Sequence, residues 1–464
     1  MEKEFTEGVK FLLAEPKRPI LKLSIPMIIG MVVHSLYNLV DGIWVAGLGS
    51  DALAAIGLFF PIFMVVISLA SGIGIGGSAA ISRKIGAKDK KMADSSAVHT
   101  LFLGLLIGIL FSIGMLPFIQ KVFLSMGAKG NVLQLVVSYA KILLSGTIII
   151  VFTNIGGGIL RGEGDTKRAM YVMVLGAGLN IFLDPVFIYQ LKMGVRGAAW
   201  ASLLSLFISS LIMWHWLFIK KDTYVDIVFS SFRLNWNIIK EILRVGIPAS
   251  FAQISMSLAS FVLNLFIIKT GGTDGIAVFT STWRILMLCL VPLMGIGMSL
   301  TSVVGAAYGE RNIFKLKEGY IYGIKMGIII ESVVVFLIVI FAPQISHLFT
   351  YSKKTVHISQ DLIKAFRILA WFLPAVPFGR LTASLFQGIG RGENALFLAI
   401  LRTIILQLFF SYLFGILLKL GISGVWCGIV SGHMIGSLIA FIWGMGTIRG
   451  LEKTLPDRIT SLPR

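Results

Sequence analysis

Two carboxylates in long apolar stretches are the side chains of this sequence best suited to chemistry. Asp41 and Asp184 both lie in runs of apolar residues, where a charged group is costly and usually serves a function. Asn180 precedes Asp184 by four residues, so a helix would place the two side chains on one face. Pro185 removes one backbone donor and exposes carbonyl oxygens in the turn before it. Together these groups are able to hold Na⁺ or a proton.

The residues leave open how the acids are used. Ser202, in the next apolar stretch, would add a hydroxyl to the set. Asp41 and Asp184 could exchange protons, or their oxygens could bind Na⁺, since hard cations prefer oxygen ligands. Two plainer interpretations also stand. Asp41 would then be an interfacial acid, and Asp184 a protonated acid bonded within a helix bundle.

The composition excludes most soluble classes of protein. The chain has 464 residues, of which 56% are hydrophobic and 14% charged, whereas soluble domains carry about 25% charged residues. An ordinary soluble enzyme, a disordered chain and a nucleic-acid module are therefore excluded. No Walker motif and no nucleophile–base pair occurs in the sequence, so we expect neither ATP as a direct energy source nor an enzyme.

Hydropathy predicts an all-α polytopic membrane protein with twelve transmembrane helices. Each predicted span has roughly the 20 apolar residues that cross a bilayer. The spans are 20–45, 53–80, 97–119, 132–158, 168–190, 197–219, 238–268, 276–304, 318–344, 361–387, 394–418 and 424–447.

The second half of the chain repeats the first. Ile20–Pro26 is echoed by Ile242–Pro248, and several glycines recur in register, Gly86 returning as Gly309. Six spans in each half give both halves the same topology, which predicts two six-helix lobes related by a pseudo-two-fold axis along the membrane normal. The predicted parts are an N-terminal segment (1–19), an N-lobe (20–220), a linker (221–237), a C-lobe (238–447) and a C-terminal tail (448–464).

The repeat does not extend to the acids. Asp41 maps to Leu263 and Asp184 to about Ser411, so we expect the ion site in the N-lobe only. Glu331 is the one acid well inside a C-lobe span. We expect Glu331 either to form an ion pair with Lys325 or to belong to a second functional site.

Two further residues have two interpretations each. Pro26 either opens the first helix harmlessly or bends it in response to the state of Asp41. Arg284 either faces a central cavity or extends outward to the membrane surface.

Loop charge predicts the orientation in the membrane. The chain has 41 Lys+Arg and 22 Asp+Glu, and the basic residues concentrate in the loops after even-numbered spans, including the one that carries Lys84 and Lys88. This bias places both termini in the cytoplasm. Basic loops next to lipid favour anionic headgroups over nucleic acid as their contact.

The sequence also resembles a known family, that of multidrug and toxic compound extrusion (MATE) transporters, and is most similar in pattern to archaeal DinF-like members. The residues that carry the resemblance span the chain and are Leu36–Trp44, Ile159–Asp165, Leu179–Pro185 and Gly305–Gly309.

The resemblance implies a V-shaped, alternating-access antiporter of the cell membrane. It would export bulky cationic or amphipathic compounds against inward H⁺ or Na⁺, without a cofactor and as a monomer. The ion site would fall on the two acids, Asn180 and Ser202, the last at a position where relatives have Thr. Tyr37, Tyr139 and Asn154 would lie near the substrate cavity or its hydrogen-bond network. Gly157 stands where relatives can carry Asn.

Two rival classes remain. A flippase for lipids or lipid-linked oligosaccharides shares this architecture and needs a cationic cavity, to which Arg284, Arg380 and Arg402 would contribute. The N-lobe acids argue against it. A membrane scaffold protein gives no reason for Asp41 and Asp184 at membrane depth.

Overall fold

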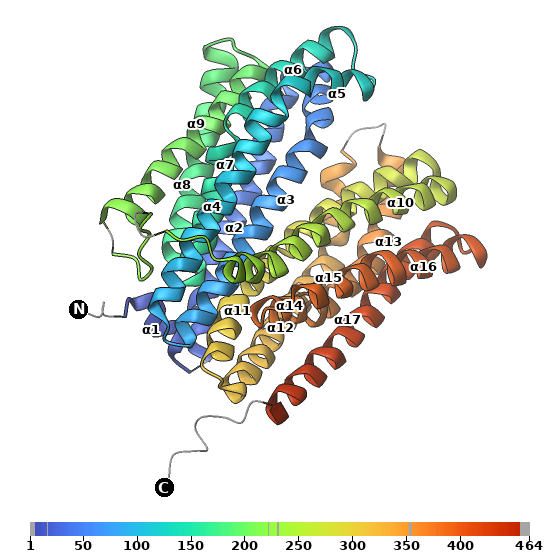
Figure 1. The fold of residues 1–464 in the computed structure, drawn as a ribbon. Coiled ribbons are helices and arrows are strands. Elements are labelled where there is room, and N and C mark those ends of the chain that lie inside the picture. The colour runs from blue at the N-terminus through green and yellow to red at the C-terminus, as the bar shows by residue number, and fades with distance from the viewer. Residues whose placement is uncertain (1–4, 16, 221, 230–231, 352–354, 455–464) are drawn as a thin grey trace.

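The structure is a computed structural model that describes residues 5–15, 17–220, 222–229, 232–351 and 355–454, and within these ranges its regular elements are all helices (Figure 1). The first half contains α1 (Glu7–Leu13), α2 (Lys17–Ala46), α3 (Ser50–Gly86), α4 (Lys90–Gly114), α5 (Ile119–Ser125), α6 (Gly130–Ser145), α7 (Thr147–Gly162), α8 (Thr166–Pro185) and α9 (Val195–Trp214). The second half contains α10 (Trp236–Cys289), α11 (Val291–Gly309), α12 (Ile313–Phe349), α13 (Ser359–Leu369), α14 (Val376–Gly388), α15 (Gly392–Ile400), α16 (Gln407–Tyr412) and α17 (Gly421–Thr454). Single π-helical turns occupy Val186–Gln190, His215–Lys220, Leu401–Leu406 and Leu413–Leu417.

The described residues form 11 helices long and apolar enough to cross a membrane, or 12 if the bent pair α6–α7 counts as one span. The axis of that pair turns by 50° at the break. The predicted all-α, multi-span architecture is therefore confirmed, and all twelve predicted segments lie on helices.

Some boundaries differ from the prediction. The predicted span 276–304 is interrupted at Leu290, where α10 ends and α11 begins with a proline in its first turn. Gly272 has a positive φ of 61° and separates this span from 238–268 within the long α10. Helix α17 is described from Gly421 to Thr454 and so includes the start of the predicted tail (448–464), whose residues 455–464 lie outside the described part of the chain.

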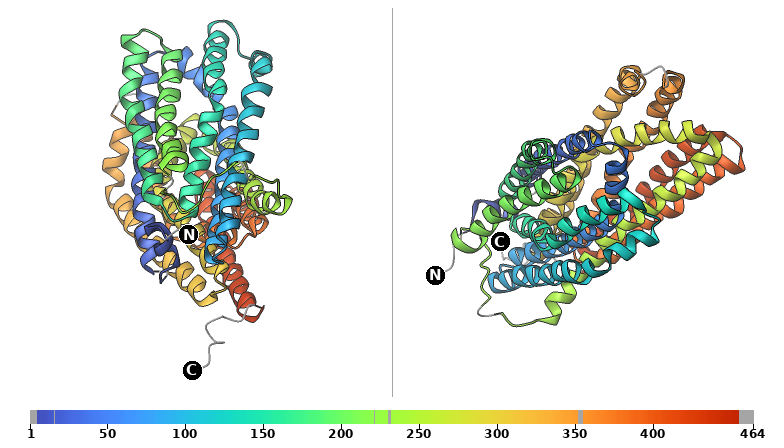
Figure 2. Two further views of the ribbon diagram at one scale, coloured as in Figure 1. Left: turned by 60° about the vertical axis from the view of Figure 1, so that its left-hand side comes forward. Right: turned by 90° about the horizontal axis from the view of Figure 1, so that it is seen from above.

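The helices gather into two bundles that diverge from one end, so that the molecule has the predicted V shape (Figures 1 and 2). One bundle holds α2–α9 and the other holds most of α10–α17 (Figure 1). The view from above shows α10 alongside the last helices of the chain (Figure 2). Helix α1 and the end of α17 both lie toward the end where the bundles meet (Figure 1). We call this the closed end.

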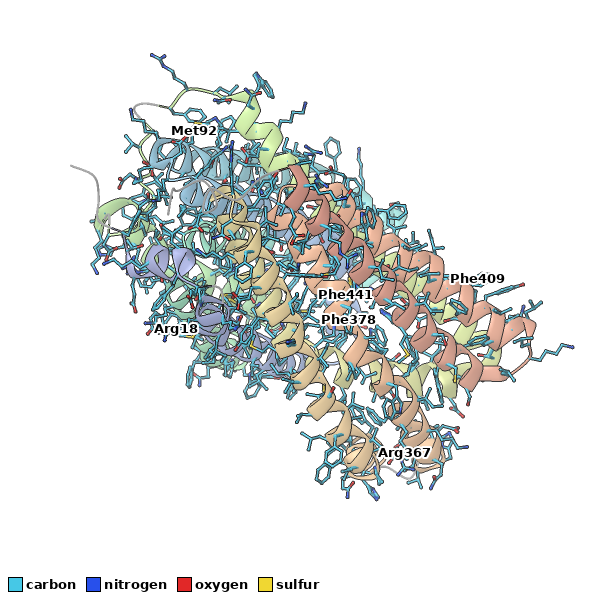
Figure 3. All side chains as sticks on the ribbon, turned by 90° about the horizontal axis from the view of Figure 1, so that it is seen from below. Arg18, Met92, Arg367, Phe378, Phe409 and Phe441 are labelled. Carbon is cyan, nitrogen blue, oxygen red and sulfur yellow. The ribbon has the colours of Figure 1, made fainter. Side chains whose placement is uncertain are left out.

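Each bundle has its own apolar core. In the C-terminal bundle the rings of Phe378 on α14 and Phe441 on α17 meet edge to face, with centroids 5.2 Å apart (Figure 3). In the N-terminal bundle Phe59 and Tyr139 make a similar edge contact at 5.5 Å. Such aromatic pairs add stability beyond the burial of their area.

The repeated pair Gly86 and Gly309 lies where the two bundles touch. A Cβ at Gly86 would overlap the carbonyl oxygen of Ala306, and a Cβ at Gly309 would overlap that of Arg83. Because small residues let helix backbones approach closely in membranes, the repeat marks both sides of one close contact at the closed end.

Candidate functional site

The structure brings the two N-lobe acids together. Asp41 on α2 and Asp184 on α8 come from helices that pack side by side, and their carboxyl groups are within hydrogen-bond reach of each other. Asp184 is fully buried, whereas Asp41 is partly exposed. The π-helical turn Val186–Gln190 follows Pro185 directly. This local break in regular α-helix is frequent at functional sites.

Asn180 and Ser202 complete a cluster of oxygen-bearing groups. The Asn180 carboxamide lies 3.2 Å from Ser202 Oγ. When its nitrogen donates to Asp184 Oδ2 at 2.8 Å, its oxygen accepts from the Ser202 hydroxyl. Asn180 and Asp184, four residues apart on α8, thus lie on one helix face, and Asn180 contacts Ser202 on α9.

The cluster suits a proton or a hard monovalent cation. Two carboxylates, a carboxamide oxygen and a hydroxyl provide oxygen ligands only, the type that hard cations prefer. Within the described residues no group of three or more His, Cys, Asp or Glu is placed to hold a metal. One carboxylate pair without a basic partner can be neutralised either by a proton or by Na⁺.

Two of the predicted network residues adjoin this cluster and one does not. The Tyr37 hydroxyl lies near Ser202 and close enough to Asp41 and Asp184 to feel their charge. Tyr139 is buried and close enough to Asp41 and Asp184 to feel their charge. Asn154 instead donates to the Ile150 carbonyl oxygen of its own helix at 2.9 Å.

Pro26 lies in the interior of α2, buried, and not in its first turn. This position rules out the harmless helix-start interpretation, because a proline inside a helix removes a backbone hydrogen bond and favours a bend. The same helix continues to Asp41 and therefore connects the proline with the acid pair.

A large cavity lies between the bundles, with about 2230 Å³ of empty space that includes open solvent. Its lining comes from both lobes and is largely apolar. The charged residues in the lining are Arg161 on α7, Arg380 on α14 and Arg402 in the turn Leu401–Leu406; no acid lines it. Arg161 was missed as a cavity residue, although it belongs to the conspicuous run Ile159–Asp165.

A smaller pocket, with about 700 Å³ of empty space that includes open solvent, lies inside the C-lobe and shares Arg380 and Arg402 with the central cavity. Trp283 lines this pocket, whereas its neighbour Arg284 is exposed and lines neither space among the residues described. Consecutive residues of a helix point about 100° apart, so burying the tryptophan turns the arginine away.

Glu331 stands alone in the C-lobe. It is fully buried, and both its carboxyl oxygens lack a hydrogen-bond partner among the described residues. The suggested ion pair with Lys325 is not formed, and Lys325 is exposed. A separation of six residues puts the two side chains on different faces of α12.

Two bundles around a shared cavity, with an acid pair buried in one of them, define a polytopic membrane transporter. The MatE family model matches residues 26–186 and 248–413, one segment in each half. The chain therefore belongs to the MATE family of multidrug efflux transporters and is not an enzyme.

Curated and solved relatives agree with this assignment. The multidrug export protein MepA of Staphylococcus aureus (strain MRSA252) is 26% identical over 436 residues, which cover 92% of this chain and 94% of the relative. An outward-facing multidrug resistance MATE transporter of the MOP superfamily is 54% identical, with a TM-score of 0.95, over 97% of this chain and all of the relative. A Pyrococcus furiosus transporter of that superfamily is also 54% identical, with a TM-score of 0.94 and the same coverage. It is described as having a binding pocket of reverse polarity that suggests a different function.

Proposed function

We propose that this MATE transporter exports bulky amphipathic or cationic compounds in exchange for inward H⁺ or Na⁺ by alternating access. The observation that carries the proposal is the close pair of a fully buried Asp184 and a partly exposed Asp41, next to Asn180 and Ser202. Two ionised carboxylates in contact at membrane depth are costly. A coupling ion neutralises one of the two carboxylates. The helix arrangement that is most stable with the ion bound should therefore differ from the one that is most stable without it.

Helix α2 supplies a route from the ion site to the lobe contact. It carries Asp41, contains Pro26, and at Ile28 approaches α11 so closely that a Cβ at Gly295 would lie 2.8 Å from the Ile28 nitrogen. A change of bend in α2 on ion binding would thus alter the packing between the bundles. The ion would then interact differently with the two conformations, as it must in order to shift the equilibrium between them.

We place the closed end in the cytoplasm of a cell whose plasma membrane the chain spans. The loop carrying Lys88 follows the helix whose end holds Arg83 and Lys84 at this end, and positive charge favours the cytoplasmic side. Both termini would then be cytoplasmic, and the arrangement described here would be open to the outside. We expect a monomer surrounded by lipid, with small molecules as cargo.

Reconstituted transport tests the proposal. Wild-type protein in liposomes would move a fluorescent amphipathic dye when a proton gradient or a Na⁺ gradient is imposed separately. Asp41→Asn and Asp184→Asn should each reduce transport to the level of empty liposomes. Asp51→Asn, an exposed acid at the start of α3, should transport normally. Full transport by both cluster variants would end the coupling model.

A flippase for lipids or lipid-linked oligosaccharides is the second candidate. The observation that favours it is the arginine-lined cavity, with Arg161, Arg380 and Arg402. Scrambling of labelled lipid that needs no gradient and survives Asp41→Asn would select this function over antiport.

A further inference from the structure

We infer that the junction of the central cavity and the C-lobe pocket binds the anionic headgroup of an amphipathic substrate, with the apolar tail in the C-lobe pocket. The inference rests on the proposed function and names its substrate class. The headgroup is a phosphate or sulfonate, carried either by a single-chain amphiphile or by a membrane lipid.

Arg402 is the centre of this site. It lies in the π-helical turn Leu401–Leu406, and its Nε and Nη1 atoms are buried without a hydrogen-bond partner among the described residues. A Cβ at Gly379 would overlap Arg402 Nη1, and Gly436 lies against the start of the same side chain. The two glycines make room for a guanidinium of which these two nitrogens are buried and unpaired. Nitrogens of a charged group in this state are costly until an anion pairs with them.

Two more arginines add to the positive charge. Arg380 lies near enough to Arg402 for the two guanidinium groups to repel each other, and Arg161 faces the same cavity from the N-lobe. No side-chain hydrogen bond or ion pair joins the guanidinium group of any of the three to another described residue, and the linings of both spaces lack Asp and Glu. A cationic headgroup would increase this repulsion, whereas a phosphate would accept several forked, charge-assisted hydrogen bonds.

The C-lobe pocket is shaped for an apolar tail. Trp283 and Phe372 stack with their centroids 5.7 Å apart. Met256, Met287 and Met294 also line the pocket, and flexible methionines adapt to tails of different shape. Because Arg380 and Arg402 line both spaces, a headgroup held by them sits where a tail can enter the pocket.

The charges have an energetic consequence. The acid pair lies outside both linings, so ion and substrate bind at separate places. Moving a cation inward and an anion outward transfers charge in the same direction across the membrane. An inside-negative membrane potential would therefore speed export of an anionic substrate.

Matched probes test binding directly. A fluorescent alkyl phosphate and an alkyl trimethylammonium of the same chain length are titrated into the protein in nanodiscs. The phosphate should bind at least about tenfold more tightly, and Arg380→Gln and Arg402→Gln should each weaken its binding about tenfold. Arg284→Gln, the exposed arginine, should leave it unchanged. Arg402→Lys should restore most of the affinity and keeps the test valid if Arg402→Gln folds poorly.

The two sources of headgroup are separated by a second titration. Vesicle-derived phosphatidic acid competes with the alkyl phosphate if a two-chain lipid fits. Failure to compete limits the site to single-chain amphiphiles. Equal binding of the two probes, or tighter binding of the ammonium, would overturn the inference.

Transport separates this inference from the proposed function. Gradient-driven export of the ammonium probe, without binding of the phosphate, would leave antiport intact and remove the anion site. Binding of the phosphate probe with no export under either gradient would support the anion site and contradict antiport. Export of the phosphate that rises with an inside-negative potential and falls in Arg402→Gln would support both.

Discussion

Arg83 Nη1 on α3 donates to the carbonyl oxygen of Gly388 on α14 at 2.8 Å, and this hydrogen bond joins the two bundles at the closed end. The Arg83 Nε atom also donates to Glu241 on α10 at 3.1 Å. One nearly buried arginine thus connects one N-lobe helix with two C-lobe helices. An opening of the closed end must break all these contacts, so they bias the molecule toward the V seen here.

Arg83→Ala should shift the molecule toward a state open at this end. Loss of charge-assisted hydrogen bonds costs about 2 kcal/mol, a shift of roughly 30-fold in the ratio of the two states. Spin labels on α3 and α10 at this end would report the change as a longer distance. Lys84→Ala removes a more exposed contact to the same Glu241 carboxylate and should shift the ratio much less. Identical distances in all three proteins would contradict this role.

Gly86→Ala tests whether the repeated glycines set the lobe contact. The added methyl group would overlap the Ala306 carbonyl oxygen, and overpacking of this kind costs about 1–3 kcal/mol. We expect a lower unfolding temperature and faster cysteine labelling of the closed end. Gly57→Ala lies on the same helix with open space around its Cβ and should be neutral or slightly stabilising. Equal unfolding temperatures and labelling rates of the two variants would mean that the close contact at Gly86 is not needed to hold the bundles together.

Pro26→Ala should straighten α2 and weaken the link between ion binding and lobe movement. A straight helix interior gains about 3 kcal/mol of helix propensity at this position, so the variant should be at least as stable as wild type. Export driven by a gradient should slow about tenfold or more. Pro248→Ala, at the repeated position inside α10, provides the matched control. Unchanged export by Pro26→Ala would reduce this proline to a packing role.

Glu163, in the turn between α7 and α8, predicts a pH dependence of stability. Burial raises the pKa of this carboxyl from 4.5 to about 8, partly offset by the Val225 N–H that donates to it at 3.0 Å. The folded state therefore holds a proton between pH 4.5 and 8 that the unfolded state has lost. Stability should fall as pH rises through this window, by at most about 1.4 kcal/mol per pH unit.

The measurement is the unfolding temperature in detergent between pH 5 and 8.5. Glu163→Gln keeps an acceptor for Val225 and should flatten the curve. Glu15→Gln, an exposed acid, should leave the slope as in wild type. A slope that survives Glu163→Gln would assign the dependence to another group.

Local sequence patterns sufficed for much of the architecture. Apolar length located the spans, because a bilayer of fixed thickness requires a minimum number of apolar residues. The repeat of Gly86 and Gly309 indicated two equivalent lobes, and the structure puts both glycines at the contact between them. Asn180 and Asp184 were placed together because a helix brings residues four apart onto one face.

Local sequence patterns did not predict the positions of side chains that depend on how each helix is rotated about its own axis. The meeting of Asp41 with Asp184, the entry of Arg161 into the cavity and the outward turn of Arg284 all depend on which face of a helix points inward. In a soluble protein the polar face would reveal this. In a membrane both lipid and protein core are apolar, so hydropathy is nearly the same on every side of a helix.

The sequence by itself therefore determined the membrane-spanning helices, their two-fold repeat and the acids worth testing, since these follow from local composition and chain length. Only the tertiary structure decided which charged groups share a space: the acid pair within the N-lobe, the arginines without counter-charges in the cavity, and a solitary Glu331. The physical reason is that helix packing in lipid is selected by close fit and hydrogen bonding, and these contacts join residues far apart in the chain.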